Sequence, residues 1–172
     1  MRPYRFCPDD GAALEEVDGE GGSRCPSCGR SWYRNPAPTV GAAIVKGGRA
    51  LIAERARQPK RGRYDVPGGF IDADEHPVEG LKREVREELA LEIEVSVEDC
   101  VSMVPHRYGD DGVAVLALGF KAQLVGAGEP RPADDVASVR WVATDELDAV
   151  DFAWPHDREL VRRALKDAAA GG

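Results

Sequence analysis

Segments rich in apolar residues recur along the chain between glycine-containing turns, and this pattern predicts β-strands. Residues 39–46 and 50–55 flank a Gly47-Gly48 pair, so we expect them to form a hairpin. Further strands are expected in the other apolar segments, at residues 64–66, 91–104, 113–125 and 139–143, with a turn at 109–112 between the two longest.

Two segments have helical character instead. Leu81, Val85 and Leu89 follow one another at four-residue intervals and make the apolar stripe of an amphipathic helix. Pro77 suits the first position of that helix, where no amide donor is needed. Residues 156–168 predict a second, terminal helix. Strands and helices together predict a mixed α/β fold.

Length and charge limit what this fold can do. The chain has 172 residues, enough for one domain of about 130 residues and a small appendage. Its net charge of -8 argues against general binding to nucleic acid or to anionic membranes. No apolar run is long enough to span a membrane, and residues 1–6 lack a signal-peptide core. We therefore expect a cytoplasmic protein that binds neither membrane nor nucleic acid.

The cysteines predict that the appendage binds zinc. Cys25 and Cys28 are two residues apart and precede a glycine, as in a zinc knuckle, and Cys7 and Asp10 repeat this spacing with Asp10 in the place of a second cysteine. A tetrahedral zinc site made by these four residues is expected; a module that has lost its metal, or a Cys25–Cys28 redox pair, are the alternatives. Prolines at 36 and 38 favour an extended linker, so we divide the chain into a zinc-ribbon-like β module, 1–35, and a larger domain, 36–172.

Three carboxylates share one face of the first predicted helix. Glu84, Glu87 and Glu88 are separated by three and four residues, so their like charges repel unless a cation neutralises them. Mg²⁺ and Mn²⁺ favour such oxygen ligands and commonly serve phosphate chemistry. The Gly68-Gly69 pair before the helix permits close approach of backbone to a ligand, and the Gly68 carbonyl offers a further metal ligand.

This region resembles the Nudix box, a motif that begins here at Gly69. The matching residues are Gly69, Glu75, Arg83, Glu84, Val85, Glu87, Glu88 and Leu91. Ala90 departs from the pattern, because the family has a glycine there that ends the helix in a left-handed turn. A left-handed alanine costs about 1 kcal/mol, so we expect a slightly altered turn with little effect on the metal face.

The resemblance implies an α/β/α sandwich around a mixed sheet, and hydrolysis of a nucleoside diphosphate linked to another moiety. It implies Mg²⁺ or Mn²⁺ held by Glu84, Glu87, Glu88 and the Gly68 carbonyl. Arg83 is expected to pair with Glu75 and so hold the box loop on the helix. The general base is left open; the candidates are Glu88 and, unless they form only a solvated acidic loop, Glu129, Asp134 and Asp135.

Substrate-binding candidates lie outside the box. A basic cluster at residues 55–63 includes Arg55 and Arg63, which could clamp the diphosphate or belong to a basic surface loop. Tyr108 could stack on a base or lie on the rim of the site, and Asp135 is the fourth candidate.

The likeness to zinc-ribbon-bearing Nudix proteins suggests a small-molecule nucleotide substrate of the ADP-ribose type. FAD, NADH and dinucleoside polyphosphates are the alternatives. The signature of the NADH pyrophosphatases is absent after the box, which makes NADH less favoured than ADP-ribose. A sensor that binds a nucleotide without cleaving it is the alternative class, and we expect a homodimer.

Overall fold

The computed structural model describes residues 4–17, 21–33, 35–110 and 112–170. The chain divides into two compact units, Met1–Pro36 and Ala37–Gly172, which we describe separately. In the described part of the chain, no helix is both long and apolar enough to cross a membrane.

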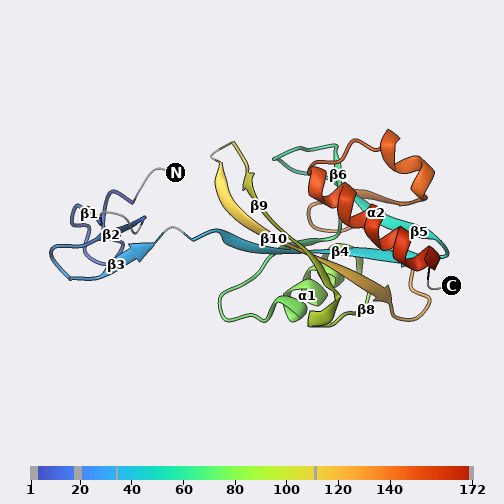
Figure 1. Cartoon of the computed structure of the whole chain (residues 1–172), viewed down its shortest axis with the longest axis horizontal. Coiled ribbons are helices and arrows are strands. Elements are labelled where there is room, and N and C mark those ends of the chain that lie inside the picture. Colours follow the sequence, from blue (N-terminus) through green and yellow to red (C-terminus); the bar gives the residue numbers. More distant parts are fainter. Residues whose placement is uncertain (1–3, 18–20, 34, 111, 171–172) are drawn as a thin grey trace. The chain divides into compact units, whose positions relative to one another are not determined.

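The N-terminal unit is a small antiparallel sheet of three short strands, in the order β1-β2-β3 (Figure 1). The strands are β1 (Glu15–Val17), β2 (Gly22–Arg24) and β3 (Ser31–Tyr33). Two tight turns follow Cys7 and Cys25 with the same backbone pattern, in which the Gly11 and Gly29 amides donate to the Cys7 and Cys25 carbonyls at 2.9 Å. The predicted β module therefore contains a pair of equivalent cysteine knuckles.

The larger unit is built on a mixed sheet whose main strands follow the order β11-β5-β4-β10-β8. The long strands are β4 (Ala37–Lys46), β5 (Arg49–Arg55), β9 (Cys100–Tyr108), β10 (Val113–Leu124) and β11 (Val136–Val142). β4 and β5 form the predicted hairpin, with Val45 opposite Ala50, whereas β10 runs parallel to β4. The short strands β6 (Tyr64–Asp65) and β7 (Gly68–Phe70) pair antiparallel with β5 and β4, respectively, and β7 contains the glycine pair.

The prediction of one strand over 91–104 is wrong, because a turn interrupts it. The segment contains β8 (Ile93–Glu94), a 3-10 turn (Val97–Asp99) and the start of β9. Asp99 accepts hydrogen bonds from both the amide and the hydroxyl of Ser96 at 2.8 Å. Short polar side chains that bond nearby backbone in this way favour turns over strands.

Two helices cover the opposite faces of the sheet. Helix α1 (Pro77–Leu89) packs Leu81, Val85 and Leu89 against Ala42 and Ile44 of β4. Helix α2 (Pro155–Ala170) packs against the other face, where the intervening residue Ala43 points, and the 3-10 helix Thr144–Ala149 precedes it. Alternate residues of β4 therefore serve the two cores. This arrangement confirms the predicted α/β/α sandwich (Figure 1).

Helix α1 ends at Ala90, and the expectation of an altered turn there is wrong. Ala90 has φ 54° and ψ 34°, and its amide donates to the Arg86 carbonyl at 2.9 Å. The left-handed turn is kept, because the hydrophobic residues on both sides, Leu89 and Leu91, are anchored in the core.

The strain at Ala90 makes a testable prediction. Replacing the exposed Ala90 by glycine relieves the left-handed strain and is expected to raise the free energy of unfolding by about 0.5–1 kcal/mol. The gain is limited to this size because glycine loses more conformational entropy on folding than alanine does. Urea denaturation of Ala90→Gly measures the change. A decrease in stability would show that the turn tolerates alanine without strain.

Candidate active site

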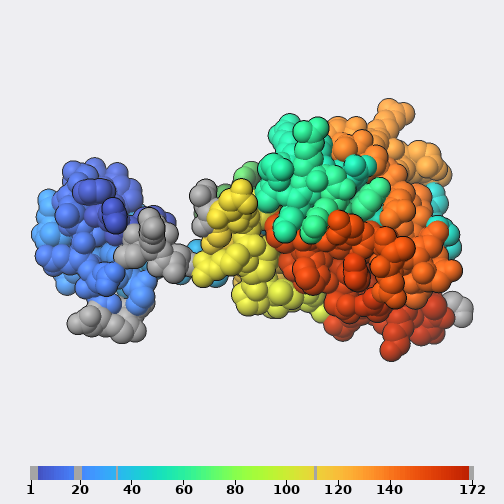
Figure 2. All heavy atoms as spheres, turned by 90° about the horizontal axis from the view of Figure 1, so that it is seen from above, coloured from blue at the N-terminus to red at the C-terminus, as the bar shows by residue number. Residues whose placement is uncertain are grey.

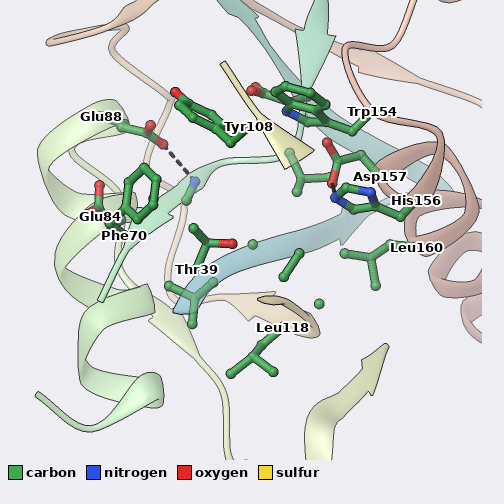
Figure 3. Close-up of a pocket in the computed structure, with 18 of the residues that line it drawn as sticks. Thr39, Phe70, Glu84, Glu88, Tyr108, Leu118, Trp154, His156, Asp157 and Leu160 are labelled. Atoms are coloured by element: carbon green, nitrogen blue, oxygen red, sulfur yellow. Dashed lines mark hydrogen bonds and ion pairs between the residues drawn. The ribbon is translucent and has the colours of Figure 1, made fainter. Parts of the chain in front are cut away.

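A cavity of about 280 Å³ lies between the box and the start of α2, and we call it the central cavity. One wall carries the glycine pair with Glu84 and Glu88 of α1. The opposite wall carries Tyr108 of β9 and the residues around the start of α2 (Figure 3). Segments far apart in the sequence therefore meet around one space large enough for part of a small ligand.

Glu84 and Glu88 lie one helical turn apart and face the glycine pair. Glu88 is buried and accepts a hydrogen bond from the Gly68 amide at 2.9 Å (Figure 3). A Cβ on Gly69 would lie 2.6 Å from the carboxylate carbon of Glu84, so a side chain at this position would displace the carboxylate of Glu84. Burial raises the pKa of both glutamates, and the charges of Asp65 and Asp135 raise that of Glu88 further. A cation bound near these two side chains would favour their ionised forms and so lower their pKa values.

Glu87 and the box loop lie beside this wall rather than in it. The Glu87 side chain is 54% exposed and binds Arg83 at 3.2 Å, outside the lining of the central cavity. The Nε and Nη2 atoms of Arg83 donate to the two oxygens of Glu75, each at 2.9 Å, and its Nη1 donates to Glu84 at 2.8 Å. The hydrogen bonds from Arg83 lower the pKa of Glu75 to about 2. Arg83 thus ties the box loop to the helix and orients Glu84.

Aromatic rings form much of the opposite wall. Tyr108 contacts Trp154 within this wall, with centroids 5.6 Å apart, and meets Phe70 of the glycine-pair wall edge-to-face, with centroids 5.4 Å apart (Figure 3). His106 lies 5.1 Å from Trp154 and 4.6 Å from His156. Planar rings spaced in this way offer stacking surface to a planar ligand.

Of the predicted arginines, the structure brings only Arg55 into the central cavity. Its guanidinium lies 2.6 Å from Asp65 and 3.2 Å from the Tyr108 hydroxyl. Burial raises the pKa of Asp65 to about 6, against the opposing charge of Arg55. Arg63 instead pairs with Asp151 at 3.2 Å and is absent from the described lining of this cavity.

The acidic loop before β11 reaches the cavity through two of its residues. Asp134 and Asp135 line the cavity, whereas Glu129 does not. The Ala133 amide donates to the Glu88 carbonyl at 2.8 Å, and the Asp135 carbonyl accepts from the Ala56 amide at 2.7 Å. These backbone bonds hold the loop at the end of α1.

Asp65, His156 and Asp157 were missed as site residues. Asp157 is buried in the first turn of α2, with His156 Nε2 3.6 Å from its carboxylate (Figure 3). Burial raises the pKa of Asp157 well above its usual value and lowers that of His156 to about 4. Acidic residues are common in the first turn of helices, so the sequence carried no signal that this one faces a cavity.

Asp157 gives the protein a specific dependence of stability on pH. The pKa of Asp157 is higher in the folded than in the unfolded protein. Its contribution to the free energy of unfolding is therefore complete below about pH 3.8 and is lost as pH rises toward the pKa of the folded protein. Asp157→Asn removes the charge without changing shape. It should change the free energy of unfolding little near pH 4 and raise it on the order of 1–2 kcal/mol at pH 8.

Urea denaturation at the two pH values measures this effect, and Asp110→Asn, on an exposed turn, is the matched control. An equal change at both pH values would contradict a buried, neutral Asp157.

In the N-terminal unit, four potential metal ligands converge. One atom each from Cys7, Asp10, Cys25 and Cys28 lies within 4.8 Å of the others. The sulfurs of Cys7 and Cys28 are 3.8 Å apart, and Cys25 Sγ lies 3.5 Å from Asp10 Oδ2. A tetrahedron with zinc–sulfur distances of about 2.3 Å has edges of about 3.8 Å, so the four residues fit a zinc ion. The Ala12 amide lowers the pKa of Asp10, which keeps this ligand ionised.

Comparisons with known proteins agree with this geometry. The sequence matches the NUDIX domain over residues 35–164. It is 39% identical over 140 residues to "Putative 8-oxo-dGTP diphosphatase 2" of Mycobacterium tuberculosis, covering 76% of this chain and 92% of that protein. It is 30% identical over 168 residues to "NAD-capped RNA hydrolase NudC" of Pseudomonas aeruginosa, covering 95% of this chain and 55% of that protein. The chain thus spans about half the length of this NudC relative.

A solved structure resembles almost the whole chain. The crystal structure of a NUDIX hydrolase from Nitrosomonas europaea superposes with a TM-score of 0.79, at 24% identity, covering 98% of this chain and 94% of that one. A MutT NUDIX hydrolase from Burkholderia pseudomallei has a TM-score of 0.61 at 29% identity, with 74% and 96% covered. The motif, the fold and the match over most of the chain lead to one conclusion: the protein belongs to the Nudix hydrolase family.

Proposed function

We propose that the protein is a Mg²⁺- or Mn²⁺-dependent hydrolase of a nucleoside diphosphate linked to a second moiety. One observation carries the metal requirement: seven carboxyl side chains and a single arginine are described in the lining of the central cavity. Even with Asp157 protonated, such a wall repels a diphosphate unless cations are bound between the carboxylates and the phosphates. The carboxylates are Asp65, Asp72, Glu84, Glu88, Asp134, Asp135 and Asp157.

Glu84, Glu88 and the Gly68 carbonyl would hold the cation, with Glu87 available from the rim. A bound Mg²⁺ or Mn²⁺ cancels diphosphate charge and makes a coordinated water more acidic. Arg83 positions Glu84, while Glu75 holds Arg83. Asp135 is the proposed general base, since Glu88 is already bonded by the Gly68 amide, Asp134 pairs with Arg57 at 3.2 Å and Glu129 lies outside the lining.

The aromatic wall would bind the planar part of the substrate. Tyr108 and Trp154 offer their faces to a nucleobase, and the carboxyl of Asp157, whose pKa is raised by burial, can both donate and accept a hydrogen bond at the ring edge when it is protonated. Arg55, at the end of this wall, can reach a phosphate oxygen only by sharing its guanidinium with Asp65.

ADP-ribose is the proposed substrate type, with FAD, NADH and dinucleoside polyphosphates next. The two relatives described above add NAD-capped RNA and 8-oxo-dGTP to the compounds to be tested. A structural neighbour, the NUDIX domain of NrtR from Shewanella oneidensis, was solved with ADP ribose.

A substrate panel with Mg²⁺ or Mn²⁺ tests the proposal. Phosphate-coupled turnover should be highest for one diphosphate-bridged compound and should vanish with a chelator. Binding of ADP-ribose without turnover of any compound would instead favour a nucleotide sensor. The homodimer stays a prediction that light scattering after size-exclusion chromatography would measure.

We also propose that the N-terminal cysteine cluster binds one structural zinc ion. The four ligands come from two equivalent knuckles, and the Cys28 amide donates to Cys25 Sγ at 3.4 Å, which would support a thiolate ligand.

Cys25→Ser is expected to lower zinc affinity at least about 100-fold, because it removes one of four ligands at a buried position. Competition with a coloured chelator measures the affinity. Cys100→Ser, at a half-buried thiol in the larger unit, is the control that should retain zinc. A wild-type protein that binds no zinc would contradict the proposal.

A further inference from the structure

A second cavity, of about 420 Å³, has a charge opposite to that of the central cavity. Its lining includes four cationic side chains, Lys60, Arg61, Arg63 and Arg107, together with Trp154 and one carboxylate, Asp110. We call it the basic cleft. It stands out in a chain whose net charge is -8.

Much of this positive charge is not neutralised within the protein. Arg63 pairs with Asp151, which is 70% exposed, and Arg107 donates to the Gly112 carbonyl at 3.0 Å. Within the described ranges, Lys60 and Arg61 have no ion pair, and both side chains are exposed. Exposed cations held together repel one another, and an anion between them relieves that repulsion.

The cleft is already formed by backbone hydrogen bonds. The Gly62 amide donates to the Arg55 carbonyl at 2.9 Å, and the Arg63 amide donates to the Lys60 carbonyl at 3.0 Å. Arg55 Nε donates to the Pro59 carbonyl at 2.7 Å, which links the loop to a residue of the central cavity. A ligand would therefore meet cations carried on a preformed loop.

The basic cleft lies next to the proposed nucleoside site. Trp154 lines both cavities, and the neighbouring residues Arg107 and Tyr108 of β9 line the basic cleft and the central cavity, respectively. Figure 2 shows the contributing segments on one face of the larger unit: the loop at 56–63 in green, the end of β9 in yellow and the start of α2 in orange-red.

From this juxtaposition we propose that the basic cleft binds a phosphate ester on the ribose of the nucleoside that stacks on Trp154. The ester lies outside the diphosphate that is cleaved. Guanidinium and ammonium groups are the side chains that bind phosphate, and four of them suit a phosphate monoester or the first phosphodiester of an oligonucleotide. The inference rests on the proposed function, because it adds a recognition element to the same substrate.

The test compares the turnover of two compounds with Mg²⁺ present. One is ADP-ribose, and the other is ADP-ribose with a phosphate monoester on the 2′ oxygen of its adenosine ribose. The double variant Lys60→Ala/Arg61→Ala removes two exposed cations of the cleft. The matched control, Lys46→Ala/Lys166→Ala, removes two exposed cations that line neither cavity. The wild type should cleave the phosphorylated compound with a kcat/KM about tenfold higher. Only the cleft variant should lose that preference, while its turnover of ADP-ribose stays unchanged.

A second arm identifies the kind of ester. A dinucleotide whose 5′ end carries the same diphosphate-linked group places a phosphodiester, instead of a monoester, beyond the ribose. If only this compound shows the preference and its loss in the cleft variant, the cleft binds a 3′ phosphodiester; if only the 2′-phosphate does, it binds a 2′ monoester; if both do, it binds either ester.

Equal kcat/KM for all three compounds, unchanged in the cleft variant, would overturn the inference while leaving the proposed function standing. Failure to cleave any of them would instead overturn the proposed function. In that case, isothermal titration with the same compounds still tests the cleft, with tighter binding of an ester-bearing compound expected in the wild type alone.

Discussion

Glu84→Gln is expected to lower kcat by about 10²–10³-fold with its best substrate, while the protein remains folded. The change removes the charge of a carboxylate that lines the central cavity, is oriented by Arg83 at 2.8 Å and would bind the cation. Loss of several kcal/mol of charge stabilisation corresponds to a decrease of that size. Steady-state turnover at saturating Mg²⁺ measures it.

Glu79→Gln is the matched control, because Glu79 lies on the same helix with its side chain 65% exposed and pairs with Lys82 away from the cavity. The control should keep near wild-type kcat. If the two variants had equal activity, Glu84 would have no part in binding the metal.

Gly68→Ala is expected to destabilise the protein by about 3 kcal/mol or more and to abolish turnover. A Cβ at this position would lie 2.1 Å from the Val40 carbonyl oxygen and 2.8 Å from Gly41 Cα, both of them backbone atoms of the central strand β4. The φ of 146° is also unfavourable for a residue with a side chain. Relief requires β7 to move away from β4, which displaces the amide that binds Glu88.

Gly47→Ala separates the two causes. Gly47 has φ 57°, but a Cβ at this position would meet no atom within 4 Å, so alanine there should cost only about 1 kcal/mol. Thermal and urea denaturation compare the two variants. Similar losses at both glycines would show that backbone conformation, and not the contact with β4, makes glycine necessary at position 68.

The part of the site that the sequence predicted most fully lies within one short segment, whereas Arg55, Tyr108, Asp134 and Asp135 were named outside it only as candidates with alternatives. The spacing of Glu84 and Glu88 on a helix, and of the glycine pair before it, depends on local geometry that the residue pattern specifies. The Arg83–Glu75 pair belongs to the same segment, so the box pattern contained it. Helical spacing could not show that Glu87 lies outside the cavity lining, because the width of the contacting face depends on the packing of neighbouring strands.

The opposite wall could not be predicted in this way, since it depends on contacts between distant segments. Asp157 faces the cavity only because α2 packs on the sheet beside β9, and Asp65 does so because β6 pairs with β5. The basic cluster at 55–63 was visible in the sequence, yet the fold turns Arg55 into the central cavity and Lys60 and Arg61 into the basic cleft. Strand and turn positions decide that division.

The most direct test of the account is hydrolysis of ADP-ribose with Mg²⁺ in ¹⁸O-labelled water, followed by mass spectrometry of the products. The account predicts AMP and ribose 5-phosphate, with one ¹⁸O atom in the phosphate of one product, and product formation by Glu84→Gln that is about 10²–10³-fold slower. Two results would contradict the claim that carboxylates of α1 bind the metal required for hydrolysis. They are stoichiometric binding of ADP-ribose with no cleavage, and cleavage that Glu84→Gln leaves unchanged.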